Sequence, residues 1–178
     1  MATDKQKFPV GRFEKPEIVT TWILRQWIEV ISDFPAAIRN ETGHLTDAQL
    51  DTEYRPGGWT IRQVVHHCAD SHLNSLIRFK LALTEENPII RPYFEDRWAE
   101  LPDSKLMPVN VSIKILEGLH ARWVFLLNSF SETDFERTFI HPESKNTVSL
   151  AENIGIYAWH CRHHLAHITN IKNEKGWK

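Results

Sequence analysis

The stretch Tyr157-Ala158-Trp159-His160-Cys161-Arg162-His163-His164-Leu165-Ala166-His167 decides the fold prediction, because its histidines and apolar residues repeat at helical spacing. Ser149 precedes it, with Glu152 three residues later, which is the capping-box pattern of a helix start. Gly176 follows, and glycine is typical just beyond a helix C-terminus. The sequence therefore predicts a helix from Ser149 to about Asn173.

This helix contains two pairs of histidines at four-residue spacing. Residues four apart differ by about 40° in direction and about 6 Å along the axis, so each pair can bind one ion. His160 and His164 form one pair, and His163 and His167 form a second pair on a different face. We favour the first pair because its flanks are apolar, whereas His163 lies nearer Arg162, where solvent is expected. The apolar flanking residues are Ile154, Tyr157, Cys161, Ile168 and Ile171.

Three more segments have helical periodicity. The first is expected from Pro16, which suits a first-turn position, to about Asn40. Pro35 is expected to bend this helix or end it early, because proline lacks the backbone N–H. The residues expected to face inward are Ile18, Trp22, Leu24, Ile28, Ile31, Phe34 and Ile38.

The other two helices have clearer limits. Thr60 and Gln63 form a capping box that predicts a helix continuing through Leu83. A further helix is expected from about Val111 to Phe130, where large apolar residues recur every three or four positions.

The segment between these two helices, residues 87–108, is expected to be a long crossover loop. It contains Pro88, Pro92, Pro102 and Pro108, with room for one short helical turn around residues 96–101. No pair of short alternating runs is joined by a hairpin signal. The sequence therefore predicts an all-α single domain over residues 1–178, namely a four-helix bundle with a long crossover between its second and third helices.

Composition excludes several classes of function. Lys and Arg number 21 against 23 acidic residues, and the net charge of -2 gives no field that attracts nucleic acid or anionic lipid. The sequence has no apolar run of membrane-spanning length, and its first residues lack the apolar core of a signal peptide. We therefore expect a cytoplasmic protein in which Cys68 and Cys161 are free thiols rather than a disulfide.

A metal site would need a third ligand from another helix, because catalytic zinc usually takes three protein ligands and keeps one position for water. The second helix offers His66, His67 and His72 within the run His66-His67-Cys68-Ala69-Asp70-Ser71-His72. Buried histidines bonded to backbone carbonyls, or a surface cluster, would explain the same pattern. Spacing alone leaves these alternatives open.

Several motifs along nearly the whole chain resemble the DinB-like superfamily, and within it the YfiT-type group of metal-dependent hydrolases, also described as bacillithiol transferases. The matching motifs are Phe8-Pro9-Val10-Gly11-Arg12-Phe13, Tyr54-Arg55-Pro56-Gly57-Gly58-Trp59-Thr60, His66 to His72, Ala99-Glu100-Leu101, Tyr157 to His160 and His163 to Ile168. One departure is visible, since many relatives have Tyr-Asp-Glu where this chain has Tyr93-Phe94-Glu95 followed by Asp96.

The resemblance implies a four-helix bundle in which His67, His160 and His164 bind one zinc or nickel ion, with water completing the sphere. It also implies a homodimer acting on a small-molecule substrate. The expected activity is metal-dependent hydrolysis. A transferase that joins a low-molecular-weight thiol to an electrophile is the alternative, because an open position that holds water can also hold a thiol.

A structural metal that only ties two helices together is a third alternative. Structural zinc normally has four protein ligands, and Glu95, Asp96 or His167 could supply the fourth.

Neighbouring residues have less definite roles. Asp70 is either an acceptor for a ligand imidazole or a surface charge near Arg62 or Lys80. His163 and His167 either support the site or face solvent. Cys68 and Cys161 are expected to be packing residues, because a step of one residue turns them off the ligand face.

Overall fold

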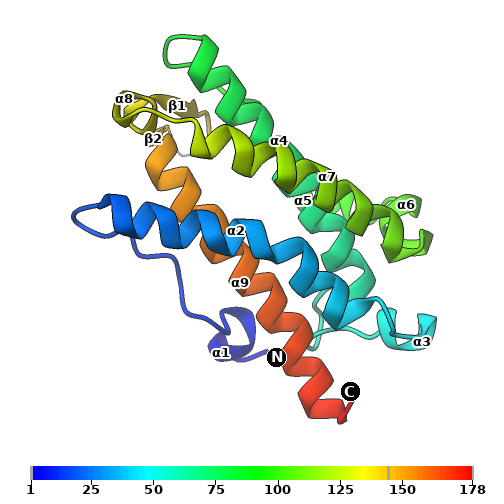
Figure 1. Cartoon of the computed structure of the whole chain (residues 1–178). Coiled ribbons are helices and arrows are strands. Elements are labelled where there is room, and N and C mark those ends of the chain that lie inside the picture. Colours follow the sequence, from blue (N-terminus) through cyan, green and yellow to red (C-terminus); the bar gives the residue numbers. More distant parts are fainter. Residues whose placement is uncertain (1, 144, 178) are drawn as a thin grey trace.

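The computed structural model describes residues 2–143 and 145–177, and four long helices dominate it (Figure 1). α2 packs against α7 and α9, and α4 packs against the same two helices. The order around the bundle is therefore α2, α9, α4, α7. The elements are α1 (Asp4–Lys7), α2 (Thr21–Thr42), α3 (Asp47–Leu50), α4 (Ile61–Thr84), α5 (Glu95–Trp98), α6 (Pro102–Leu106), α7 (Val109–Asn128), α8 (Glu132–Glu136), β1 (Thr138–His141), β2 (Asn146–Ser149) and α9 (Leu150–Lys175).

The expected four-helix bundle is confirmed, and local sequence signals explain where two helices begin. Thr60 and Gln63 form the complete capping box at the start of α4. At α9, the Ser149 side chain accepts a hydrogen bond from the Glu152 backbone N–H, and Gly176 ends the helix in the left-handed conformation with a φ of 67°. Among the described residues, no helix combines the length and hydropathy of a membrane span.

The prediction for the first helix was wrong in two respects. α2 begins after Thr20, so Ile18 lies outside it, and both Ile18 and Trp22 are exposed rather than inward. Of the two outcomes expected at Pro35, the early end is wrong, because α2 runs through it to Thr42, although the proline has no N–H to offer the Ile31 carbonyl four residues earlier. That carbonyl instead accepts a hydrogen bond from His120 Nδ1 at 2.5 Å. A side chain on α7 thus replaces the missing backbone donor.

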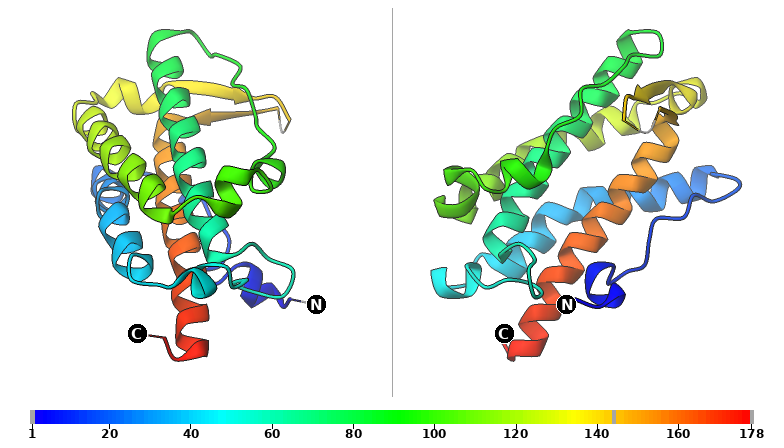
Figure 2. Two further views of the ribbon diagram at one scale, coloured as in Figure 1. Left: turned by 90° about the vertical axis from the view of Figure 1, so that its right-hand side faces the viewer. Right: turned by 180° about the vertical axis from the view of Figure 1, so that it is seen from behind.

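The expectation of no hairpin was also wrong. β1 and β2 pair antiparallel, with Phe139 opposite Val148 and Ile140 opposite Thr147. The Ile140 N–H donates to the Pro88 carbonyl at 2.9 Å, and its carbonyl accepts from Ile90 N–H at 3.1 Å. The crossover backbone therefore supports this short hairpin, and in Figure 2 both lie on one side of the bundle.

The crossover between α4 and α7 is confirmed, but it contains two short helices, α5 and α6, instead of one helical turn. The core of the bundle is filled by large side chains with less than 2% exposure, including Phe79 on α4 and Trp123 on α7. α4 also packs against α9, which places the histidines of these two helices within reach of one another.

Candidate metal centre

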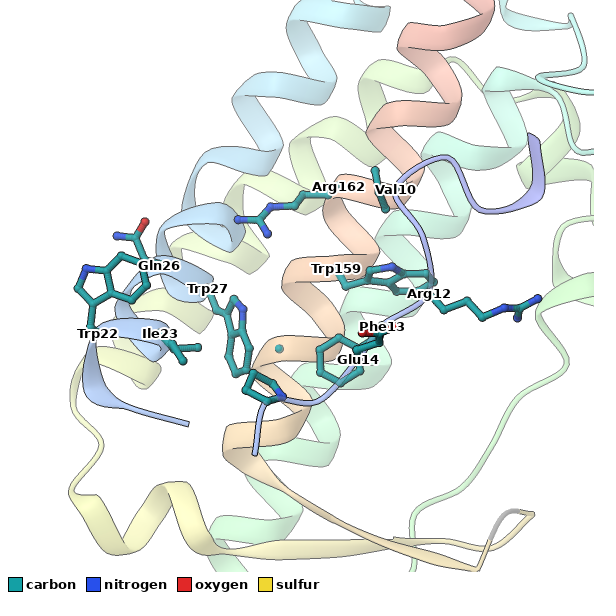
Figure 3. A pocket seen from close by; sticks show the side chains of 12 residues that line it. Val10, Arg12, Phe13, Glu14, Trp22, Ile23, Gln26, Trp27, Trp159 and Arg162 are labelled. Carbon is teal, nitrogen blue, oxygen red and sulfur yellow. The ribbon is translucent and has the colours of Figure 1, made fainter. Parts of the chain in front are cut away.

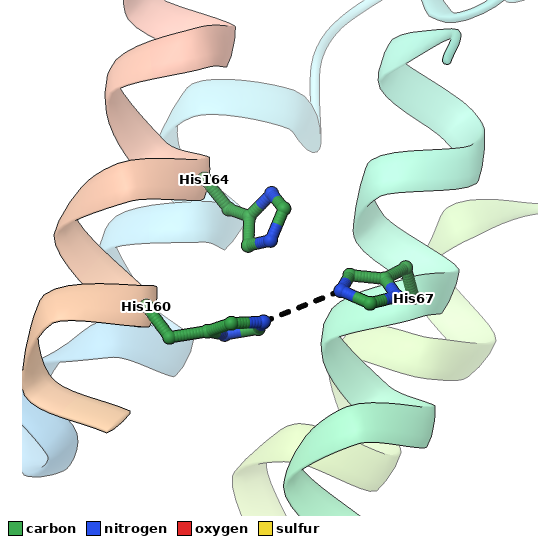
Figure 4. A group of neighbouring side chains, drawn as sticks. All are labelled: His67, His160 and His164. Carbon is green, nitrogen blue, oxygen red and sulfur yellow. Dashed lines mark hydrogen bonds between the residues drawn. The ribbon is translucent and has the colours of Figure 1, made fainter. Parts of the chain in front are cut away.

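Three imidazoles from two adjacent helices point toward one another (Figure 4). His67 projects from α4, and His160 and His164 project from successive turns of α9. One ligand nitrogen from each residue lies within 4.8 Å of the other two. The Nε2 atoms of His67 and His160 are 3.2 Å apart. Because His160 and His164 are four residues apart, their rings lie on the same face of α9, and both point toward His67 on α4.

These residues fit a divalent metal ion. Zinc–imidazole bonds are about 2.0 to 2.1 Å long, so two nitrogens in a tetrahedral sphere lie about 3.3 to 3.4 Å apart, close to the separation between His67 and His160. Burial lowers the pKa of His67 to about 4 and the pKa values of His160 and His164 well below their usual range. All three rings are therefore neutral at pH 7 and each has a lone pair to donate.

The three histidines line a cavity of about 320 Å³. Its walls also include residues of the crossover and of the β1–β2 hairpin, so the cavity is built from four parts of the chain. The remaining lining residues are Ser71, Arg78, Pro92, Tyr93, Glu95, His141, Glu143, Tyr157, Trp159 and His163. A small molecule in this cavity would lie directly beside a metal ion held by the histidines.

Some residues that line the cavity have buried polar atoms without a hydrogen-bond partner in the described part of the chain. Arg78 Nε and His141 Nδ1 are buried and have no hydrogen-bond partner among the described residues. Tyr157 is committed to the protein, because its hydroxyl donates to the Ser71 carbonyl at 3.0 Å. His163 Nδ1 and His164 Nδ1 are likewise unpaired, and because unpaired buried polar atoms are costly, these four side chains are candidates to bind a polar ligand.

A larger cavity of about 530 Å³ lies on another face of α9, where the N-terminal segment crosses it (Figure 3). Phe13 packs against Trp27 with ring centroids 6.3 Å apart, and Trp159 Nε1 donates to the Gly11 carbonyl at 2.9 Å. Its lining is mainly aromatic and aliphatic, and none of the three clustered histidines is part of it. Chemistry rather than volume therefore identifies the candidate centre.

Comparison with known proteins agrees with this geometry. A family model described as the DinB superfamily matches residues 27–168. The chain belongs to the DinB superfamily. A protein of Oceanobacillus iheyensis named "Putative metal-dependent hydrolase OB0782" is 53% identical over 172 residues, covering 97% of this chain and 99% of the relative. A Bacillus mycoides relative with the same type of name is 54% identical over 171 residues, covering 96% and 98% of the two chains.

A solved structure shares the fold of this DinB protein. It is described by the statement "YfiT from Bacillus subtilis is a probable metal-dependent hydrolase with an unusual four-helix bundle topology". The TM-score is 0.96 at 46% sequence identity, and the match covers 98% of this chain and 99% of the other. The DinB resemblance stated from the sequence motifs is thereby confirmed.

The second histidine pair of this DinB chain is buried, so the expectation that His163 faces solvent was wrong. His163 Nε2 and His167 Nε2 lie 3.0 Å apart and hydrogen-bond to each other. Trp159 stacks on His163 at 4.6 Å, and Tyr54 lies 4.0 Å from His167 between ring centroids. His163 lines the cavity, whereas His167 is not among its lining residues. The N-terminal half of the chain thus covers a helix face that periodicity alone assigned to solvent.

The other two histidines of the α4 run have separate places. His66 is buried away from the cluster, with its ring nitrogens 2.7 Å from Ser112 Oγ and 3.0 Å from the Met107 carbonyl. His72 lies behind His160, and its Nε2 is 3.0 Å from His160 Nδ1. On its other side His72 meets His120, a residue that sequence reasoning missed. The sequence signal that could have found His120 is its position as a single histidine on the apolar face of α7.

Among the described residues, the cluster of possible metal ligands contains only histidines, and the nearby carboxylates and thiols lie outside it. Among the described residues no hydrogen bond joins the Asp70 carboxylate to a ligand imidazole, and burial raises its pKa to about 6. Glu95 lines the cavity, whereas Asp96 does not. Cys68 and Cys161 are free, buried thiols whose pKa values are raised by burial, so the prediction that they are packing residues is confirmed.

Proposed function

We propose that this DinB protein is a metal-dependent hydrolase of a small polar substrate, and that His67, His160 and His164 bind one divalent ion, zinc or nickel. The observation that carries the proposal is the convergence of three neutral ring nitrogens within 4.8 Å at the edge of a cavity. The names of the relatives and of the YfiT structure support the same activity. The homodimer and the cytoplasmic location stay predictions from the sequence.

A divalent ion held by three neutral imidazoles would supply a Lewis acid and would lower the pKa of a coordinated water toward about 7. The protein's own residues would do the rest. Arg78 would bind an anionic or carbonyl oxygen of the substrate through its free Nε–H. Tyr93 and Glu95 on the crossover would limit the space beside the ion and orient the substrate against it.

The metal proposal is tested with two double variants of the same helix. His160→Ala/His164→Ala should abolish stoichiometric zinc or nickel in the purified protein, because the metal loses two of its three ligands. His163→Ala/His167→Ala removes the other pair and should retain the metal. Elemental analysis measures both, with circular dichroism confirming the fold. Metal retained by the first variant and lost by the second would show that the wrong pair has been chosen.

Hydrolysis is tested with metal-loaded protein on a panel of esters, amides and phosphoesters. We expect turnover that chelation removes and that zinc or nickel restores. Arg78→Gln should raise KM more than it lowers kcat, because this side chain is assigned to substrate binding. Absence of turnover on the whole panel would contradict the hydrolase proposal while leaving the metal site standing.

A metal-dependent S-transferase is the second candidate. The burial of the chain's thiols determines where the reacting thiol would come from. Because Cys68 and Cys161 are buried, the reacting thiol would have to be a separate low-molecular-weight molecule. The test follows thiol consumption with monochlorobimane as electrophile. A rate unchanged by His164→Ala would exclude this candidate.

A structural metal ranks third. The cluster found among the described residues contains three ligands, whereas a structural zinc site usually contains four. Neither Glu95, Asp96 nor His167 belongs to it. The cavity beside the cluster also provides the space that catalysis needs.

A further inference from the structure

A chain of hydrogen bonds runs from the backbone of α2 to the proposed metal ligand His160. His120 Nδ1 lies 2.5 Å from the Ile31 carbonyl oxygen, and His120 Nε2 lies 2.7 Å from His72 Nδ1. His72 Nε2 then lies 3.0 Å from His160 Nδ1. The chain links α2, α7, α4 and α9, so all four long helices of the bundle contribute to it.

The carbonyl at the start of this chain determines the direction of every bond. A carbonyl oxygen can only accept, so His120 must carry its proton on Nδ1. A neutral imidazole has one N–H and one acceptor nitrogen, so His120 Nε2 accepts from His72 Nδ1–H. His72 Nε2 accepts in turn from His160 Nδ1–H. His160 is then left with an unprotonated Nε2, which is the atom that faces His67.

Pro35 explains why the Ile31 carbonyl is available. In a regular α-helix the N–H of residue 35 would donate to the carbonyl of residue 31, but proline has no N–H. The carbonyl is buried and needs a donor, because an unpaired buried polar group is unfavourable. His120 supplies that donor. The proline thus selects the tautomer of His120.

The part of the chain from Ile31 to His72 is buried, whereas His160 at its end is half-buried and lines the cavity. Ile31 and His72 have 0% exposure and His120 has 2%. Aromatic rings enclose the two histidines. The ring centroid of Phe34 lies 5.2 Å from that of His72 and 5.8 Å from that of His120, and Trp123 packs on both. Burial lowers the pKa of His120 to about 4, so its ring is neutral at pH 7. Each ring therefore keeps one donor and one acceptor.

We propose that His72 and His120 are positioning residues that fix His160 as the Nδ1–H tautomer and thereby direct the Nε2 lone pair toward the metal. The inference rests on the proposed metal function. Neither residue touches the ion or the substrate. They disfavour the Nε2–H tautomer of His160 in the metal-free protein. Metal binding therefore does not have to displace a proton from Nε2.

The first test uses the wild-type protein without metal, so its outcome does not depend on metal binding. Two-bond ¹H–¹⁵N correlation spectra at pH 7.5 report which ring nitrogen is protonated. The signals of His160 are assigned by their loss in His160→Gln. We expect a protonated Nδ1 and a bare Nε2 in His72, His120 and His160. A protonated Nε2 on His72 or His160 would overturn the inference.

The second test measures zinc affinity by competition with a chromogenic chelator. His72→Leu should weaken zinc binding by about 10- to 100-fold, the usual effect of removing the partner of a ligand imidazole. His72→Gln retains one donor and one acceptor and should recover part of that loss. His66→Leu is the matched control, because His66 is also buried on α4 and makes two hydrogen bonds outside this chain.

The outcomes separate the two proposals. Wild-type zinc affinity in His72→Leu would overturn the positioning role while leaving the metal site intact. An equal loss in His72→Leu and His66→Leu would also overturn it, because the effect would then come from general destabilisation of α4. Wild-type protein that binds no zinc would refute the metal function, and the tautomers would then decide whether the hydrogen-bond chain exists.

Discussion

Gly155→Ala would place a methyl group where α9 meets α2 and the N-terminal segment. A Cβ at this position would lie 2.8 Å from two ring carbons of Trp27, Cη2 and Cζ3, and 3.0 Å from Phe13 Cζ. These separations are well below ordinary carbon–carbon contact, so the aromatic rings would have to move. Gly118 on α7 provides the control, because a Cβ added there meets nothing within 4 Å.

The two substitutions share one favourable effect and differ in one unfavourable effect. Alanine is about 1 kcal/mol better than glycine inside a helix, and both positions gain this amount. Overpacking at Gly155 costs about 1 to 3 kcal/mol. We therefore expect Gly118→Ala to stabilise the protein by about 1 kcal/mol and Gly155→Ala to be less stable than Gly118→Ala by about 1 to 3 kcal/mol.

Urea and thermal unfolding measure this difference. For a protein of this size it corresponds to about 2 to 12 °C in Tm between the two variants. In a Trp27→Leu background the ring is gone, so Gly155→Ala should recover most of its lost stability. If Gly155→Ala stabilised the wild-type protein as much as Gly118→Ala does, the close packing of α9 on Trp27 would be refuted.

Three further predictions concern charge and burial. The pKa of His120 is about 4 when folded and near 6.5 when unfolded, so its contribution is fully present above about pH 7 and falls by about 3 kcal/mol by pH 4. Urea titrations should show a smaller loss on acidification in His120→Leu; an equal loss would contradict the assignment. Arg62→Met should cost about 1 to 2 kcal/mol in urea unfolding, because the buried guanidinium donates to Asp51 at 2.6 Å, to Asp47 at 2.7 Å and to the Met107 carbonyl at 3.1 Å; an unchanged midpoint would show that these bonds together contribute nothing. Cys68 and Cys161 should resist iodoacetamide in the folded protein and react in urea, as followed by mass spectrometry; rapid labelling without urea would contradict their burial.

Local signals predicted the helices well, and distant contacts explain the errors. Thr60 and Gln63 correctly located the start of α4, because a capping box is complete within four residues. An early helix end at Pro35 was one of the expected outcomes, and it was wrong because the donor that replaces the missing N–H comes from His120 on α7, 85 positions later in the sequence, a contact that no local pattern reveals. The hairpin was missed because its strands have four residues each and depend on backbone bonds to the crossover.

For the candidate site too, local spacing was predicted correctly and features that depend on distant contacts were not. The spacing of His160 and His164 was readable within one helix, whereas His67 required the family resemblance to choose it from three histidines of α4. The burial of His163 depends on Trp159 and on Phe8, whose ring lies 6.0 Å away from that of His163. Helical periodicity within α9 cannot show that another segment of the chain packs over one of its faces. The burial of this face was therefore not predicted.

The cavity has a further consequence for how such a protein changes over evolution. The three clustered histidines lie on α4 and α9, whereas Tyr93, Glu95, His141 and Glu143 enter the cavity from the crossover and the hairpin. Connecting segments accept substitutions and insertions more readily than packed helices do. Mutations there can reshape the opening and exchange one substrate for another without a loss of reactivity at the centre. Descendants of a common ancestor could thus acquire new substrates one loop at a time.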